Sequence, residues 1–192
     1  MRDCDEKHGF MCMDTRAYNA QPPPTAAPDI GGSCPDGWDL QLGGFCYRIN
    51  ITRGLYFTEA FAQCRALGAG SELASIGNEP EQEFVLAVAK REYDMLTAIG
   101  GRPHAPNQLW VGFAYRDGQL KALDGSPITY TNWLPNQPDQ DAAPARTYCV
   151  CMEAISGRWS SVPCAGALSY GIVCKRPKRT LVRSRLVWHT IH

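Results

Sequence analysis

Nine cysteines are spread over the 192 residues of this chain rather than grouped as close pairs. Reducing compartments disfavour such usage, whereas oxidising ones allow disulfides to persist and to stabilise a fold. The cysteines therefore predict a disulfide-linked protein that is secreted or lies on the extracellular side of the plasma membrane. The first residues, Met1–Glu6, have no basic stretch followed by an apolar one. They do not form a signal peptide, so we expect the chain to be a fragment or to lack its natural start.

The remaining composition suits one domain and argues against two classes of protein. A length of 192 residues and a hydrophobic fraction of 44% are enough for a single core with some sequence left over. Lysine plus arginine and aspartate plus glutamate both number 19, so bulk charge gives no affinity for nucleic acid. The longest apolar run, Phe84–Ala89, is far shorter than the roughly 20 residues that span a bilayer. We therefore expect no nucleic-acid partner and no membrane span in this chain.

Changes in composition divide the chain into four segments. The tract Gln21–Pro28 contains four prolines, favours extended polyproline II and cannot build a core, which indicates a linker. The expected segments are a short N-terminal segment with two cysteines, which we call the N-terminal remnant (1–12), a proline-rich linker (13–33), a compact domain (34–176) and a basic tail without acidic residues (177–192).

Two helices are predicted in the first half of the compact segment. Apolar residues recur at helical spacing after Thr58, which is a good N-cap, and Gly68 supplies the stop. A second helix begins at the cap residue Asn78, where Glu81 can reach back three residues to the cap. This helix should end near Glu92.

The second half of the compact segment has the texture of a β-sheet. From Leu109 onward, short β-branched and aromatic runs alternate with glycine, proline, asparagine and aspartate. Helices followed by short strands are typical of an α+β domain with an antiparallel sheet. The segment 133–146 is rich in proline and aspartate and has no periodicity, so it is predicted to be a long functional loop.

Several short motifs lie between about Cys34 and Arg176. The central one is Trp110-Val111-Gly112-Phe113. The others are Glu59-Ala60 through Cys64-Arg65, Leu73-Ala74-Ser75-Ile76, Asp124-Gly125-Ser126-Pro127 to Thr131-Asn132-Trp133, and Trp159 five residues before Cys164. Together these motifs resemble the C-type lectin-like domain family, and the central motif resembles the core signature of that family. The resemblance implies a long-form C-type lectin-like fold, with two helices, antiparallel sheets, a long ligand-binding loop and disulfide cross-links.

The resemblance also implies a disulfide pattern. The implied bridges are Cys34–Cys46, Cys64–Cys174 and Cys149–Cys164. Spacing alone leaves a bridge from Cys151 to Cys164 open, but the family pattern of Cys, Val, any residue, Met fits residues 149–152 and selects Cys149. Cys151 is then left over, and an odd cysteine in a secreted module suggests an intermolecular disulfide. Cys4 and Cys12 are further candidates for such a link.

The first twelve residues form a partial internal repeat. The segment Cys4–Cys12 resembles the closing segment of such a domain and parallels Cys164–Cys174. We therefore expect a lectin-like module to precede this one in the natural protein, as in proteins with tandem C-type lectin domains. The alternative is a local loop in which Cys4 and Cys12 bridge one another.

The resemblance places a calcium and sugar site in the long loop. Sugar-binding members hold calcium with a Glu-Pro-Asn or Gln-Pro-Asp triplet, a Glu before the third cysteine and an Asn-Asp pair after the conserved Trp. The Gln-Pro-Asp form implies a galactose-type preference. The matching residues here are Gln137-Pro138-Asp139, with Thr147 in place of the Glu and Ser160-Ser161 in place of the Asn-Asp pair.

These replacements predict a degenerate calcium site. Calcium takes about six to eight oxygen ligands, several of them anionic, and the three family carboxylates are reduced here to Asp139 alone. Gln137 and Asp139 remain as metal candidates, and Asp141 is a candidate substitute carboxylate. We therefore expect no required cofactor and at most weak calcium binding.

The domain is expected to act in extracellular recognition of a glycan or a protein. The first hypothesis is a lectin domain of carbohydrate-binding descent with a degenerate calcium site. The alternative is a calcium-independent protein-binding module, in adhesion or innate recognition, that uses the loop 133–146. A single sequon, Asn50-Ile51-Thr52, predicts a glycoprotein modified at Asn50.

An enzyme is not expected. The unpaired Cys151 would need a histidine beside it to act as a nucleophile. The four histidines, His8, His104, His189 and His192, lie in the N-terminal remnant, a loop and the tail, and nothing in the sequence brings them to Cys151.

Overall fold

A computed structural model of the chain describes residues 32–38, 40–98, 107–139, 146–165 and 168–180. The expected N-terminal remnant, Asp141 and all four histidines lie outside the described residues, as do most of the expected linker and basic tail. The described residues contain most of the expected compact domain.

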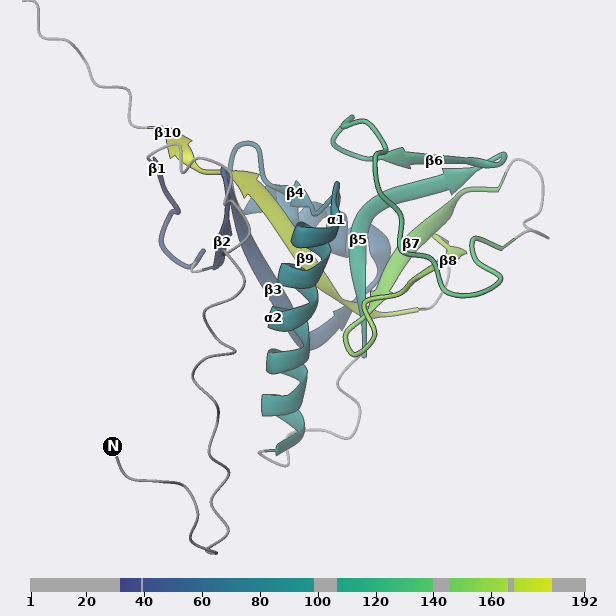
Figure 1. Cartoon of the computed structure of the whole chain (residues 1–192), viewed down its shortest axis with the longest axis horizontal. Helices are drawn as coiled ribbons and strands as arrows, with labels where there is room; N and C mark the ends of the chain where they lie inside the picture. The colour runs from purple at the N-terminus through teal and green to yellow at the C-terminus, as the bar shows by residue number, and fades with distance from the viewer. Residues whose placement is uncertain (1–31, 39, 99–106, 140–145, 166–167, 181–192) are drawn as a thin grey trace, which may run out of the picture.

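In the part of the chain that the structure describes, both helices precede Gln108 and every later element is a strand, as Figure 1 shows. The helices are α1 (Phe57–Ala66) and α2 (Glu79–Ala98). The strands are β1 (Gly32–Ser33), β2 (Leu40–Leu42), β3 (Phe45–Leu55), β4 (Glu72–Leu73), β5 (Gln108–Arg116), β6 (Gln119–Ala122), β7 (Tyr148–Glu153), β8 (Trp159–Pro163), β9 (Tyr170–Pro177) and β10 (Arg179–Thr180).

The described residues form two sheets, and the larger one has eight strands. Its order is β2-β3-β9-β5-β7-β8, with β4 beside β9 and β6 beside β5. All strand pairs are antiparallel except β5 and β9, which run parallel. In Figure 1 the helix α2 lies between the β2–β3 part of this sheet and the part formed by β5 to β8. The predicted α+β class is therefore confirmed, and the parallel pair is the one departure from the expected antiparallel arrangement.

Helix α1 begins earlier than expected. The side chain of Glu59, at the third helical position, accepts a hydrogen bond from the backbone N–H of Tyr56 at 3.0 Å. This makes Tyr56, and not the predicted Thr58, the N-cap. The buried face of the helix consists of Ala60 and Cys64, so the expected inward orientation of Cys64 is confirmed.

Helix α2 begins as expected and ends later. The Asn78 side chain accepts a hydrogen bond from the Glu81 N–H at 2.9 Å, as a capping residue should. The helix continues to Ala98 rather than ending near Glu92, because Tyr93 and Leu96 pack against the hydrophobic core. No helix among the described residues has the length and apolar character that a membrane crossing requires.

The structure contains the three expected disulfides. Cys64–Cys174 ties α1 to β9 across 110 residues, Cys149–Cys164 ties β7 to the residue after β8, and Cys34–Cys46 ties the segment after β1 to β3. In the chain-entropy description, closing a loop as long as that between Cys64 and Cys174 stabilises the fold by about 4 to 5 kcal/mol.

The core signature motif lies where two backbones approach closely. The N–H of Gly112 donates to the carbonyl oxygen of Ala74 at 2.8 Å. A Cβ on Gly112 would lie only 2.3 Å from the Leu73 carbonyl oxygen, so no larger residue fits there. Its neighbour Trp110 is 1% exposed, and its indole N–H donates to the Leu55 carbonyl oxygen at 2.8 Å. The motif thus joins β5 to the segment that follows β4.

A short strand pair closes the domain where the chain enters and leaves it. Gly32 and Ser33 of β1 pair with Thr180 and Arg179 of β10. These strands lie in the segments expected to be linker and basic tail. Regular structure therefore extends beyond the expected limits 34–176.

We expect Gly112→Ala to destabilise the domain strongly, because the new methyl group would contact backbone atoms that have no room to move. Overpacking a core costs about 1 to 3 kcal/mol, and a clash with backbone should reach at least the top of that range. Denaturant unfolding measures the change in the free energy of unfolding. Gly118→Asn is the control, since nothing lies within 4 Å of a Cβ there and asparagine tolerates its φ of +78°. A loss below about 1 kcal/mol for Gly112→Ala would contradict this account.

Candidate functional site

The first part of the long loop runs along the free edge of β8. The Trp159 N–H donates to the Asn132 carbonyl oxygen at 2.8 Å, and the Leu134 N–H donates to the Trp159 carbonyl oxygen at 2.9 Å. These two bonds form a parallel bridge between Trp133 and Trp159. The loop is therefore attached to the sheet by backbone hydrogen bonds before it reaches the candidate site.

Trp159 is fixed from the core side by α2. Its indole N–H donates to the Gln82 Oε1 at 2.8 Å, and Gln82 Nε2 donates to the Gly157 carbonyl oxygen at 3.1 Å. The Trp159 ring is fully buried and packs edge-on against Trp133 at a centroid distance of 5.8 Å. Trp159 therefore packs in the core and presents no face to a sugar. The sequence motifs did not predict the role of its partner Gln82. A glutamine on a helix can be assigned a hydrogen-bond partner only when the strand that packs against the helix is known.

Three of the candidate residues meet in one group of hydrogen bonds, which we call the Ser161 clasp. Gln137 Oε1 accepts from the backbone N–H of Ser161 at 2.8 Å and from the Ser161 hydroxyl at 3.0 Å. The same hydroxyl oxygen accepts from the backbone N–H of Asp139 at 2.8 Å. Ser161 is 6% exposed, so these bonds are largely shielded from water. The clasp ties both ends of the Gln137-Pro138-Asp139 triplet to β8.

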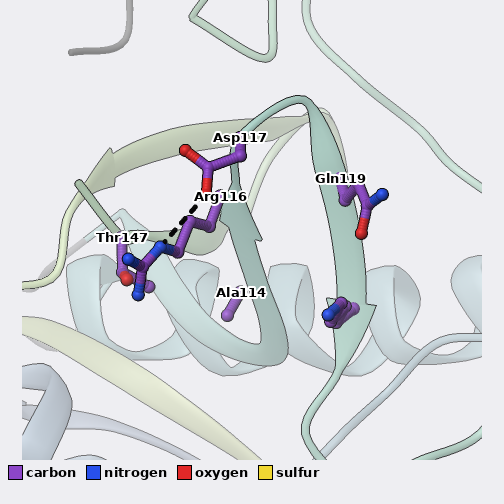
Figure 2. Close-up of a pocket in the computed structure, with 6 residues that line it drawn as sticks. Ala114, Arg116, Asp117, Gln119 and Thr147 are labelled. Atoms are coloured by element: carbon purple, nitrogen blue, oxygen red, sulfur yellow. Dashed lines mark hydrogen bonds and ion pairs between the residues drawn. The ribbon is translucent and has the colours of Figure 1, made fainter. Parts of the chain in front are cut away.

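The other candidates have different surroundings. Ser160 precedes Ser161 on β8, so its side chain points to the opposite face of the strand. Thr147 is exposed and lines a separate hollow with Ala114 and Arg116, shown in Figure 2. Asp141 lies outside the described residues.

The donor set meets few requirements of a calcium ion. Asp139 is the only carboxylate among the described candidates, and Gln137 Oε1 already accepts two hydrogen bonds from Ser161. Calcium needs about six to eight oxygens with several negative charges among them. No group of three or more His, Cys, Asp or Glu side chains suited to a metal occurs in the described part of the chain. The described residues of this loop therefore offer too few anionic oxygens for such an ion.

Cys151 is buried in the domain. It is 1% exposed, and its Sγ lies 2.9 Å from Gln108 Oε1, to which the thiol donates. Burial raises the pKa of the Cys151 thiol to about 12. The expectation of an intermolecular disulfide through Cys151 is wrong for the folded domain, because another chain cannot reach this sulfur.

The glycosylation sequon has a local structure of its own. Asn50 Oδ1 accepts from the backbone N–H of Thr52 at 3.0 Å and from the Thr52 hydroxyl at 2.9 Å. Thr52 is exposed and Asn50 is half-buried. Glycosylation at Asn50 stays a prediction.

The motifs gave no indication of the hollow that Thr147 lines. Its walls include Arg116, Gln119 and Lys121, from the hairpin that β5 and β6 form. The available signal was the Asp117-Gly118 pair between two short runs, which is a strong hairpin signature. Reading that hairpin with period-two alternation would have placed these side chains on one face.

The fold and the loop define a recognition domain of the lectin type, and comparison with known proteins identifies its family. Residues 53–176 match the family described as Lectin C-type domain. The chain is 31% identical to mouse C-type mannose receptor 2 over 175 residues, which cover 89% of this chain and 10% of that protein. The carbohydrate-recognition domain of cow CD23 has a TM-score of 0.59 and 25% identity, over 78% of this chain and 99% of that one. The human scavenger receptor C-type lectin domain has a TM-score of 0.56 and 22% identity, over 76% and 100%.

This chain belongs to the C-type lectin domain family. The family that it matches is one of lectins and not of enzymes. The chain spans 10% of the length of the mannose receptor relatives that it matches.

We expect Ser161→Ala to loosen the loop. The substitution removes the hydroxyl, which donates to Gln137 and accepts from the Asp139 N–H. Loss of two partly buried hydrogen bonds should lower the free energy of unfolding by about 1 to 3 kcal/mol. Ser160→Ala is the control, because it removes the neighbouring hydroxyl outside the clasp. Amide hydrogen exchange of Asp139 measures the local effect, and equal exchange in both variants would contradict the role of the clasp.

We expect the Cys151 thiol to be unreactive in the folded protein. A pKa of about 12 leaves roughly one thiol in ten thousand ionised at pH 8, and burial blocks access to that fraction. Iodoacetamide treatment followed by peptide mass spectrometry should find Cys151 unmodified in the native chain and modified after treatment in guanidinium chloride. Modification within minutes in the native chain would show that the thiol is accessible.

Proposed function

We propose that this domain is an extracellular recognition module of carbohydrate-binding descent whose ligand site works without calcium. The observation that carries the proposal is the Ser161 clasp. In the family pattern, Gln137 and Asp139 belong to the calcium cage, whereas here hydrogen bonds from Ser161 hold the triplet against β8. A calcium ion would normally order this loop, and the clasp supplies that order from the protein's own groups.

Energetics support the same conclusion. A calcium ion at Gln137 would have to displace two hydrogen bonds, each worth about 0.5 to 1.5 kcal/mol. In return it would gain one carboxylate, that of Asp139, in place of the three in the family pattern. Ligand charge count is a main determinant of calcium affinity in proteins. A weak or absent calcium site follows, with the Gln-Pro-Asp triplet kept for its hydrogen bonds.

The placement outside the cell rests on the disulfides. Three bridges occur among the described residues, and such bridges persist in oxidising compartments. The relatives include C-type mannose receptor 2 and a CD23 domain crystallised with an oligosaccharide. We infer a secreted or cell-surface protein that recognises a glycan.

Thermal unfolding of the oxidatively refolded chain in calcium and in chelator tests the proposal. We expect the midpoint to agree within about 1 °C, because an ion that does not bind the folded state cannot stabilise it. A clear rise in calcium would contradict the proposal.

The matched variant restores the family pattern through Thr147→Glu, Ser160→Asn and Ser161→Asp together. This variant replaces the clasp with anionic oxygens, so calcium at about 100 times Kd should raise its midpoint by roughly 5 to 10 °C. Binding in chelator that neutral sugars do not compete, and that loop substitutions abolish, would favour the alternative of a protein ligand.

A further inference from the structure

A hollow lined by several polar side chains lies on the sheet formed by β5, β6 and β7, outside the Gln137-Pro138-Asp139 loop. Its lining is shown in Figure 2 and consists of Ala114, Arg116, Asp117, Gln119, Lys121 and Thr147. Its volume is about 530 Å³. The hairpin that shapes it turns at Asp117 and Gly118, both with positive φ.

Strand register places the lining side chains on one face. Ala114 pairs with Lys121 on β6, and Arg116 pairs with Gln119. Residues two apart on a strand point the same way, so Ala114 and Arg116 share a face with Gln119 and Lys121. Ala114 also pairs with Cys149 of β7, which puts Thr147 on the same face. The hollow exists because Ala114, the shortest side chain of the set, lies between longer ones.

The charges in this hollow favour an anion. Among the described residues, no carboxylate lies within ion-pair distance of Lys121. The Arg116 Nε donates to the Asp117 carboxylate at 3.3 Å, which leaves the two terminal nitrogens of the guanidinium for another acceptor. Among the described residues that line the hollow, one carboxylate stands against two cations, so the hollow is locally positive although the chain is neutral overall.

We propose that this hollow binds an anionic group, a sulfate or a carboxylate, carried by a glycan. Arg116 and Lys121 supply the charge-assisted donors, and guanidinium groups suit the planar or tetrahedral oxygens of such anions. Gln119 and Thr147 line the same hollow, and their side chains carry neutral donors and acceptors for sugar hydroxyls. The choice of a glycan rests on the proposed function of the domain.

The test uses the refolded full chain in chelator, with biolayer interferometry against surfaces that carry sulfated lactose, sialyllactose or unsubstituted lactose. We expect binding to at least one anionic surface at least about tenfold tighter than to lactose, and weaker at higher salt. The sulfated and sialylated surfaces distinguish a sulfate from a carboxylate. The double variant R116Q/K121Q should lose at least about tenfold in affinity for the preferred surface.

The matched control is K90Q/R91Q, which removes two exposed cations from α2 and changes the net charge equally. Its affinity should stay within about twofold of the unmodified chain. An equal loss in both variants would show that bulk charge causes the binding and would overturn the proposal. Equal binding to all three surfaces, or no binding to either anionic one, would overturn it too. Binding to lactose in chelator, as tight as to the anionic surfaces, would contradict the anion-binding hollow but not calcium-independent recognition. A calcium-dependent unfolding midpoint would contradict calcium-independent recognition. The failure of one proposal can therefore be told from the failure of the other.

Discussion

Two adjacent polar residues near the start of α2 join the strands β3 and β9 to the strand β8. Glu81 accepts a hydrogen bond from the Tyr47 hydroxyl of β3 at 2.8 Å and forms an ion pair with Lys175 of β9 at 2.6 Å. Burial and the Glu81 charge raise the pKa of Tyr47, so the hydroxyl stays protonated and remains a donor. Gln82 turns to the other side and accepts from the Trp159 indole of β8. A buried polar group without its partner costs about 1 to 3 kcal/mol, so α2 sets the positions of β3, β9 and β8 together.

The position of β8 in turn decides what the long loop can do. Trp159 fixes the strand, and Ser161 follows two residues later on the same face, where it reaches Gln137. In the family pattern an aspartate at this position would carry charge for a metal. A serine offers one donor and an acceptor, which suits an amide oxygen and a backbone N–H. Ser161 therefore ties the loop to β8 by hydrogen bonds from the protein itself.

Local patterns predicted the features that depend on a few neighbouring residues. The Asn78 cap was found because capping needs only residues three apart, and the resemblance supplied the three disulfides. The length of α2 was missed because Tyr93 and Leu96 make contacts with residues far away in the chain. The candidate residues were chosen as matches to a calcium and sugar motif, whereas the hydrogen bonds that they form depend on the register of β8 against the loop. The position of Thr147 beside the β5–β6 hairpin was missed for the same reason. It depends on how β5, β6 and β7 pair, and the sequence of a single strand does not determine its pairing.

The Ser161 clasp holds a loop, whereas the hollow lies on paired strands, and this difference suits them to different roles. The clasp orders a loop, so its geometry depends on the hydrogen bonds of Ser161. The hollow is built on three hydrogen-bonded strands, and the Cys149–Cys164 disulfide anchors the third of them. Side chains on strands lose less freedom on binding than those on a loop, which favours recognition by a preformed surface. The domain therefore has, apart from the long loop, a preformed charged surface that is available to a ligand.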